Sequence, residues 1–143
     1  MTLHRSSSAA ETARAGAEAA LALEPGDLVL VKGELGAGKT TFVRGACREL
    51  GVSGPVPSPT FTIGRRYEGG RGVKISHLDL YRLTGMEAED AALLEDYLTP
   101  DAIAFVEWPG VAGDELRDPA VVVEIRHAGG DAREISVERS PAQ

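Results

Sequence analysis

The segment Gly33–Thr40 has the residue types and spacing that most clearly indicate chemistry. Its sequence, GELGAGKT, fits the phosphate-binding pattern G-x-x-x-x-G-K-[ST]. The apolar run Asp27–Lys32 before it is typical of a buried strand, and Thr41–Leu50 after it has a helical period. This order of strand, glycine loop and helix directs backbone N–H groups and a helix N-terminus at a phosphate chain. The segment therefore predicts a nucleotide-phosphate site, and an ordinary glycine turn is the alternative interpretation.

Each polar group of this loop has an expected role in such a site. The Lys39 ammonium is expected to contact the β- and γ-phosphates, and the Thr40 hydroxyl is expected to bind Mg²⁺. Backbone N–H groups along the loop are expected to bind phosphate oxygens. The residues that supply them are Gly36, Ala37, Gly38 and Thr41.

Two carboxylates at the ends of apolar runs compete for the position beside the metal. Glu107 follows the continuous apolar run Ala102–Val106 and is the favoured Mg²⁺ ligand, because Mg²⁺ prefers oxygen donors. Asp79 lies near the end of the expected strand Val73–Leu80. It is expected to bind a metal-bound water or to orient the attacking water. A structural ion pair with Arg82 is the alternative for Asp79.

Three further residues are candidates with weaker signals. Thr60 follows a proline-rich loop from which a switch threonine could reach the metal or the γ-phosphate, and a rigid turn explains it equally well. His77 lies on an expected strand, and a structural role is favoured over a role in the site. Trp108 is expected to pack rather than to contact a ligand.

Composition restricts the class of protein. The 143 residues suffice for one domain, 1–143, and the 43% apolar and 26% charged residues are typical of a soluble globular protein. The net charge of −7 argues against binding nucleic acid unaided. No apolar run is long enough to cross a membrane, the N-terminus lacks the apolar region of a signal peptide, and the single cysteine excludes an intrachain disulfide. These features predict a cytoplasmic protein.

Missing motifs narrow the choice of nucleotide. The sequence contains no [NT]-K-x-D, which reads guanine in switch GTPases, and this absence favours ATP. It also lacks Leu-Ser-Gly-Gly-Gln, which excludes an ABC transporter subunit.

The pattern of expected elements predicts an α/β protein, a P-loop NTPase-like three-layer fold with a mixed parallel and antiparallel sheet. The sheet must be mixed because Phe61–Tyr67 and Val73–Leu80 are joined by the short turn Glu68–Gly72, which makes them antiparallel. The other expected elements are helices from the capping box at Ser8 to Ala22, over Thr41–Leu50 and over Met86–Tyr97, and strands over Asp27–Lys32, Ala102–Val106, Ala120–His127 and Arg133–Glu138.

Four motifs occur together and in a characteristic order. They are Gly33–Phe42, Ser58–Thr62, His77–Arg82 and Glu107–Pro109. Over nearly its whole length the chain resembles the TsaE (YjeE) family of bacterial P-loop ATPases. One departure is Glu34, where the family usually has Asp.

The resemblance implies a function that the residues alone do not show. Such proteins are required to form threonylcarbamoyladenosine in tRNA, at the adenosine next to the anticodon, and they act with TsaD and TsaB. The carbamoyl transfer belongs to TsaD, and the ATPase resets or drives the complex. The resemblance therefore implies an ATP- and Mg²⁺-dependent ATPase, weak alone, that meets tRNA through its partners. A small-molecule kinase and a non-catalytic, nucleotide-dependent scaffold are the alternatives.

Roles are carried over by position. Thr40 and Glu107 correspond to Mg²⁺ ligands, and Gly36–Thr41 to the phosphate cradle. Asp79 corresponds to a second acidic residue of the catalytic centre, and Thr60 to a residue of a switch-type loop. The adenine would lie between the segment around Ala9 and the segment around Ala132 and Arg133.

Overall fold

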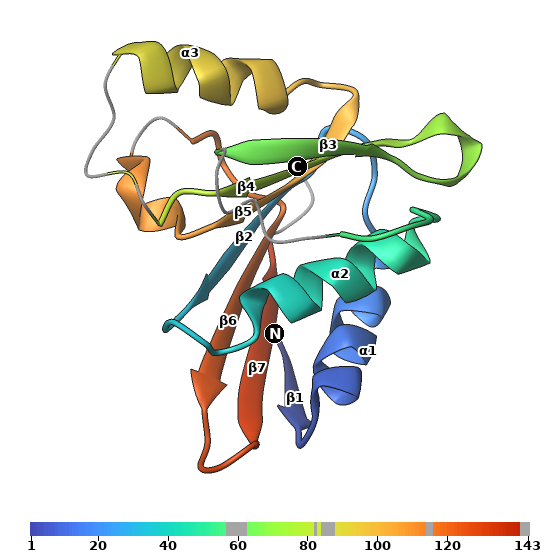
Figure 1. Cartoon of the computed structure of the whole chain (residues 1–143), viewed down its shortest axis with the longest axis vertical. Coiled ribbons are helices and arrows are strands. Elements are labelled where there is room, and N and C mark those ends of the chain that lie inside the picture. Colours follow the sequence, from blue (N-terminus) through green and yellow to red (C-terminus); the bar gives the residue numbers. More distant parts are fainter. Residues whose placement is uncertain (57–62, 82, 84–87, 114–115, 141–143) are drawn as a thin grey trace.

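A mixed β-sheet forms the centre of the protein (Figure 1). The computed structural model describes residues 1–56, 63–81, 83, 88–113 and 116–140. In this part of the chain seven strands pair in the order β1-β7-β6-β2-β5-β4-β3. Their bounds are β1 Thr2–Ser6, β2 Leu28–Gly33, β3 Gly64–Glu68, β4 Lys74–Asp79, β5 Ala102–Glu107, β6 Val121–His127 and β7 Arg133–Arg139. The strands β6, β2, β5 and β4 are parallel. Strands β7 and β3 flank them antiparallel, and β1 pairs antiparallel with β7 at the edge. The expected mixed α/β sheet is confirmed.

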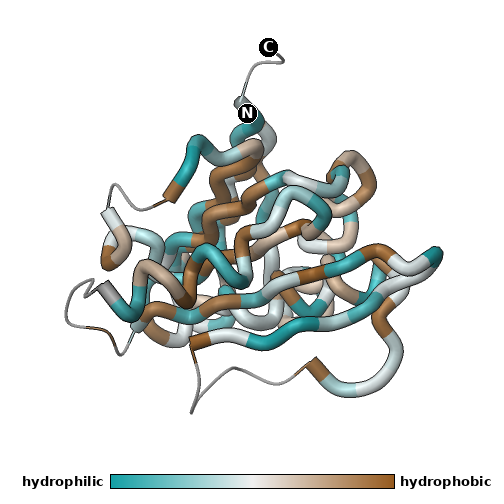
Figure 2. Tube along the Cα trace, turned by 90° about the horizontal axis from the view of Figure 1, so that it is seen from above, coloured by the Kyte–Doolittle hydropathy of each residue, from teal (hydrophilic) through white to brown (hydrophobic). Residues whose placement is uncertain are grey.

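Helices cover the two faces of this sheet and complete the three layers. The described helices are α1 Ala9–Ala20, α2 Lys39–Glu49 and α3 Ala88–Tyr97, with two short 3₁₀ turns, η1 Gly70–Gly72 and η2 Pro109–Val111. Figure 1 shows α1 and α2 side by side, with α3 at the other end of the molecule beside β3. One apolar core joins α1 and α2 to the sheet, and a second joins α3 to the opposite face. Figure 2 shows hydrophobic segments gathered in the middle of the molecule.

The interior strand β5 explains how this layering positions a polar residue. All six of its residues are buried, as is usual for a parallel strand covered on both faces. Ile103 and Phe105 point into the core below α1 and α2, whereas Ala104 and Val106 point into the core below α3. The alternation ends at Glu107, which the apolar run fixes at the carboxyl edge of the sheet.

Two glycines let α1 and α2 pack with their backbones in contact. A Cβ atom added to Gly45 would lie 1.9 Å from the backbone oxygen of Ala13, and one added to Gly16 would lie 2.0 Å from that of Phe42. No side chain fits in either gap. The close contact holds α2, which begins at the nucleotide loop, firmly against α1.

The boundaries agree with the expected elements apart from a few differences. Helix α1 is capped by Ser8, whose hydroxyl accepts from the Glu11 N–H, but it ends two residues before the expected Ala22. Strand β1 was not predicted, because a short, largely exposed edge strand carries no apolar run that marks it. The expected positions 61–62 and 86–87 lie outside the described residues. No helix in the described part of the chain is long and apolar enough to cross a membrane.

The helix contact generates a stability prediction. Gly45→Ala is expected to lower the free energy of unfolding by about 1–3 kcal/mol, because the methyl group must push apart two backbones. The measurement is the urea unfolding midpoint followed by circular dichroism. Gly110→Ala is the matched control, since a Cβ atom there meets nothing within 4 Å. Equal midpoints for both variants would contradict the close contact of α1 and α2.

Candidate active site

The loop between β2 and α2 has a backbone that only glycine adopts readily. Gly36 and Gly38 have φ angles of 75° and 108°, in the left-handed region. Gly38 is also the N-cap of α2, and no side chain caps the helix there. The free N–H groups at the start of α2 therefore point out of the helix toward the loop, the arrangement that binds phosphate.

The Lys39 side chain is folded back over this loop. Its ammonium donates to the backbone oxygens of Gly33 and Glu34 at 2.9 and 2.8 Å, and it lies 4.3 Å from the centre of the Trp108 ring. The residue is only 5% exposed. Burial lowers the pKa of Lys39, although the nearby carboxylates Glu107 and Asp79 act in the opposite direction. The ammonium is thus incompletely compensated and positioned to bind an anion.

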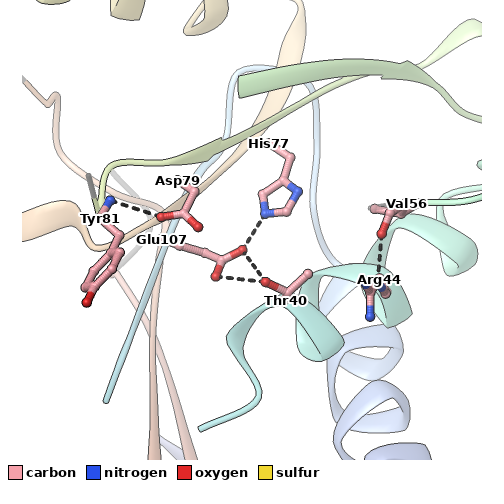
Figure 3. Close-up of polar contacts among 7 residues, drawn as sticks. All are labelled: Thr40, Arg44, Val56, His77, Asp79, Tyr81 and Glu107. Atoms are coloured by element: carbon pink, nitrogen blue, oxygen red, sulfur yellow. Dashed lines mark hydrogen bonds and ion pairs between the residues drawn. The ribbon is translucent and has the colours of Figure 1, made fainter. Parts of the chain in front are cut away.

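Thr40, the next residue, bonds directly to the buried carboxylate of Glu107 (Figure 3). Its hydroxyl oxygen lies 3.1 and 3.0 Å from the two carboxylate oxygens. Glu107 ends β5 and is 2% exposed. The hydroxyl donates its proton to the carboxylate, which leaves the oxygen lone pairs of Thr40 for a cation.

Asp79 lies beside Glu107 at the carboxyl edge of the sheet. The two residues are register partners in the parallel pair β4 and β5. The pKa of Asp79 is raised, chiefly by burial and also by the charge of Glu107, against an opposing hydrogen bond from the Tyr81 N–H at 3.0 Å. Two adjacent carboxylates next to one lysine repel each other, so a bound cation would stabilise this site.

The donor set of this site fits a hard divalent cation. It offers the hydroxyl of Thr40 and the carboxylates of Glu107 and Asp79, all oxygen donors of the kind that Mg²⁺ prefers. Among the described residues no three His, Cys, Asp or Glu side chains converge as a metal cage. Mg²⁺ does not need such a cage, because it takes most of its ligands from phosphates and water.

Cavities lie on both sides of the phosphate loop. One of about 310 Å³ is lined by the polar residues Lys39, Thr40, Asp79 and Glu107. Another of about 440 Å³ lies between the loop, the start of α1 and the β6–β7 turn. Ala9 and Arg133, from the two segments expected to flank the adenine, line this second cavity. Arg133 also donates from Nε to the backbone oxygen of Ala37 at 3.1 Å, which ties the turn to the loop.

Two aromatic residues form a wall of the smaller cavity. Trp108 has a left-handed backbone, with φ of 58°, a conformation that costs about 1–3 kcal/mol for a non-glycine residue. This turn places the Trp108 ring under the Lys39 ammonium and 4.9 Å from the Tyr81 ring. Trp108 packs, as expected, but it packs in the site itself. Sequence reasoning missed Tyr81, whose only signal was its place two residues after Asp79.

His77 is the other residue whose position sequence reasoning did not anticipate. It is completely buried, and its Nε2 lies 2.5 Å from a carboxylate oxygen of Glu107 (Figure 3). The sequence favours a structural role for His77, and the structure places it against Glu107, the favoured metal ligand. The available signal was spacing, since His77 and Asp79 are two residues apart on one strand and share a face.

The structure therefore brings four of the expected polar residues together and leaves two positions open. Lys39, Thr40, Asp79 and Glu107 share one cavity. Thr60, and the alternative partner Arg82 of Asp79, lie outside the described residues. Arg44 on α2 donates from Nε to the backbone oxygen of Val56 at 2.6 Å, which ties this part of the chain to the helix (Figure 3).

Comparison with known proteins agrees with the motifs. A family model described as "Threonylcarbamoyl adenosine biosynthesis protein TsaE" matches residues 6–135. The chain belongs to the TsaE family. This result confirms the resemblance inferred from the sequence.

Individual relatives of the TsaE family align over most of the chain. Proteins named "tRNA threonylcarbamoyladenosine biosynthesis protein TsaE" are 43% identical in Streptomyces coelicolor, over 81% of this chain and 79% of the relative, and 34% identical in Treponema pallidum, over 92% and 96%. The crystal structure of YdiB from Bacillus subtilis superposes with a TM-score of 0.74 at 31% identity, covering 94% of this chain and 82% of YdiB. The fold and the family are thus supported independently.

The raised pKa of Asp79 predicts how a substitution changes stability with pH. The folded-state pKa exceeds the unfolded one, so the ionised carboxylate destabilises the fold above both values, and the penalty vanishes below the ordinary carboxyl pKa of about 4. Asp79→Asn is expected to stabilise the protein at pH 7, by less than about 1 kcal/mol because solvent screens a half-buried group. Urea unfolding at pH 7 and pH 3.5 measures the difference.

Asp101→Asn is the control with the opposite sign. Hydrogen bonds from Thr99 and Lys74 lower the pKa of Asp101, so its carboxylate stabilises the fold at neutral pH and loses that effect as the pH falls. The Asp101→Asn variant is therefore expected to be less stable at pH 7. If Asp79→Asn were destabilising in the same way, the account of the two adjacent acids would be wrong.

Proposed function

We propose that this protein binds and hydrolyses ATP as a subunit of the system that forms threonylcarbamoyladenosine in tRNA, at the adenosine next to the anticodon. Membership of the TsaE family and the names of its relatives support the tRNA modification. The observation that carries the ATPase proposal is the direct bond from Thr40 to Glu107 beside Lys39, directly after a phosphate-binding loop. TsaD and TsaB are the proposed partners.

Phosphate binding would relieve the unfavourable burial of Lys39. In this structure the ammonium donates to two loop carbonyls and lies over an aromatic ring. A polyphosphate would give the ammonium hydrogen bonds to an anion, which add charge attraction to what neutral carbonyl acceptors provide. The N–H groups at the start of α2 would bind the same anion.

Mg²⁺ would be held by Thr40 and Glu107, where it would neutralise charge on the phosphates. Asp79 is the better placed of the two acids to accept a proton or to orient the attacking water. It is half-buried rather than fully buried, and its raised pKa moves it toward the working pH of a general base.

The rim of the cavity explains why the activity would depend on partners. Leu35 and Tyr81 border it and are 66% and 50% exposed. Phosphoryl transfer benefits from a site that excludes water, and this rim leaves the site open to solvent. The net charge of −7 likewise supports a tRNA surface supplied by the partners. The cytoplasmic location expected from the sequence stays a prediction, and a tRNA substrate is consistent with it.

Lys39→Ala is expected to weaken ATP binding by about 100-fold or more, because a hydrogen bond to a charged group contributes about 1.5–3 kcal/mol and Lys39 makes more than one. The variant removes a buried, poorly compensated charge, so its thermal midpoint is not expected to fall. Affinity is measured by titration calorimetry.

Lys32→Ala is the matched control for this experiment. It removes the same charge from an exposed residue of β2, seven positions before Lys39 and outside the phosphate cavity. Its ATP affinity is expected to stay within about 2-fold of the unchanged protein. Comparable losses in both variants would mean that general electrostatics, not the Lys39 site, attracts the nucleotide.

Reconstituted tRNA modification tests the proposed function as a whole. The protein alone is expected to hydrolyse ATP slowly and to do so at least about 10-fold faster with TsaD and TsaB, because docking closes the open rim. Modification of the tRNA should require this protein and fail with its Lys39→Ala variant. Product formation is followed by mass spectrometry of digested tRNA.

Other outcomes would favour the alternatives. ATP consumption that rises only with a small metabolite, and not with TsaD and TsaB, would identify a small-molecule kinase. Full modification with a non-hydrolysable ATP analogue would identify a nucleotide-dependent scaffold.

A further inference from the structure

A buried histidine lies directly behind the proposed metal ligand. His77 is 0% exposed and projects from β4 into the core face covered by α2, while Glu107 projects from the neighbouring strand β5 (Figure 3). Its Nε2 is 2.5 Å from Oε2 of Glu107. A polar side chain buried so completely is costly unless its hydrogen bonds are satisfied, and here the bond is made to the site.

The hydrogen-bond network assigns the proton of this histidine. Nε2 faces a carboxylate oxygen, which accepts, so Nε2 carries the proton and donates. Within the described part of the chain Nδ1 has no hydrogen-bond partner. Among the described residues, Nε2 is therefore the ring nitrogen that has a partner, and that partner is Glu107.

Thr40 alone does not fix the Glu107 carboxylate. Its hydroxyl has one proton, while its oxygen lies at nearly the same distance, 3.1 and 3.0 Å, from both carboxylate oxygens. The bond from His77 goes only to Oε2 and therefore distinguishes the two oxygens. With both bonds present, the carboxylate is held in one orientation, and Oε1 has Thr40 as its only hydrogen-bond donor among the described residues.

We propose that His77 is a positioning residue of this site: the Nε2–H of its imidazole holds Oε2 of Glu107 and so orients the carboxylate toward the Mg²⁺-nucleotide. The inference rests on the proposed ATPase function and adds to it a residue that acts through Glu107. Donors that orient a ligating carboxylate or imidazole are worth about 10- to 100-fold in metal affinity or activity in other metal sites. His77 itself touches neither nucleotide nor metal in this arrangement.

Two substitutions separate orientation from packing. His77→Gln keeps an N–H donor at a similar reach, whereas His77→Met fills similar space without a donor. His77→Met is expected to lower kcat about 10- to 100-fold and to remove most of the gain in ATP affinity that Mg²⁺ gives. Its affinity in EDTA should stay within about 3-fold, and His77→Gln should recover most of the loss. Affinity is read from the fluorescence of the single tryptophan, Trp108, and thermal midpoints confirm folding.

A double-mutant cycle with Glu107→Gln completes the test. If His77 acts through Glu107, then His77→Met should change kcat and the Mg²⁺ effect by less than about 2-fold once Glu107 is replaced. Additive losses, an unchanged His77→Met variant, or folded Gln and Met variants that are equally impaired would overturn the inference. If the unchanged protein failed to bind ATP, the proposed function and this inference would both fall; if it bound ATP and the cycle were additive, only the inference would fall.

Discussion

A carboxylate taken almost entirely out of water constrains the rest of this structure. Glu107 is 2% exposed, and a buried carboxylate is strongly destabilising unless donors or a cation compensate it. Its donors come from two different elements, Thr40 from the start of α2 and His77 from β4. The buried carboxylate of Glu107 is tolerated only if both donors reach it. This requires the observed sheet register, and it requires α2 to lie where the glycine contact with α1 holds it. The fold is in this sense built around the end of β5.

The same region holds charges that do not balance one another in the free protein. Lys39 is desolvated, and Asp79 and Glu107 are neighbours of like charge. Trp108 adds a left-handed backbone that is unfavourable for its residue type. A fold tolerates such unfavourable conformations and buried charges only where the surrounding packing holds them in place. They occur mainly at sites where a bound ligand supplies the missing interactions. Here the apolar cores on both sides of the sheet hold these residues in place.

The sequence could predict the parts of this site that depend on local pattern. The phosphate loop, the buried strand leading to Glu107 and the mixed sheet all follow from short-range periodicity and turn residues. The bond from His77 to Glu107 could not be predicted in this way, because it depends on the register between two strands far apart in the chain. Strand β1 was not predicted for a related reason, because its pairing with β7 and not its own composition makes it a strand. The roles of Thr60 and of the other site residues remain predictions.

The hydrogen bond from Arg133 to the backbone oxygen of Ala37 affects when, during synthesis and folding, the phosphate loop is complete. It joins residues 96 positions apart, so the cradle is fastened by a hairpin near the end of the chain. Strand β2, which leads into the cradle, likewise pairs on both sides with strands synthesised after it, β5 and β6. A nascent chain still lacking these segments presents the GKT motif without its supports. The nucleotide that we propose for this site would therefore contribute its binding energy to stability only after the β6–β7 hairpin has formed.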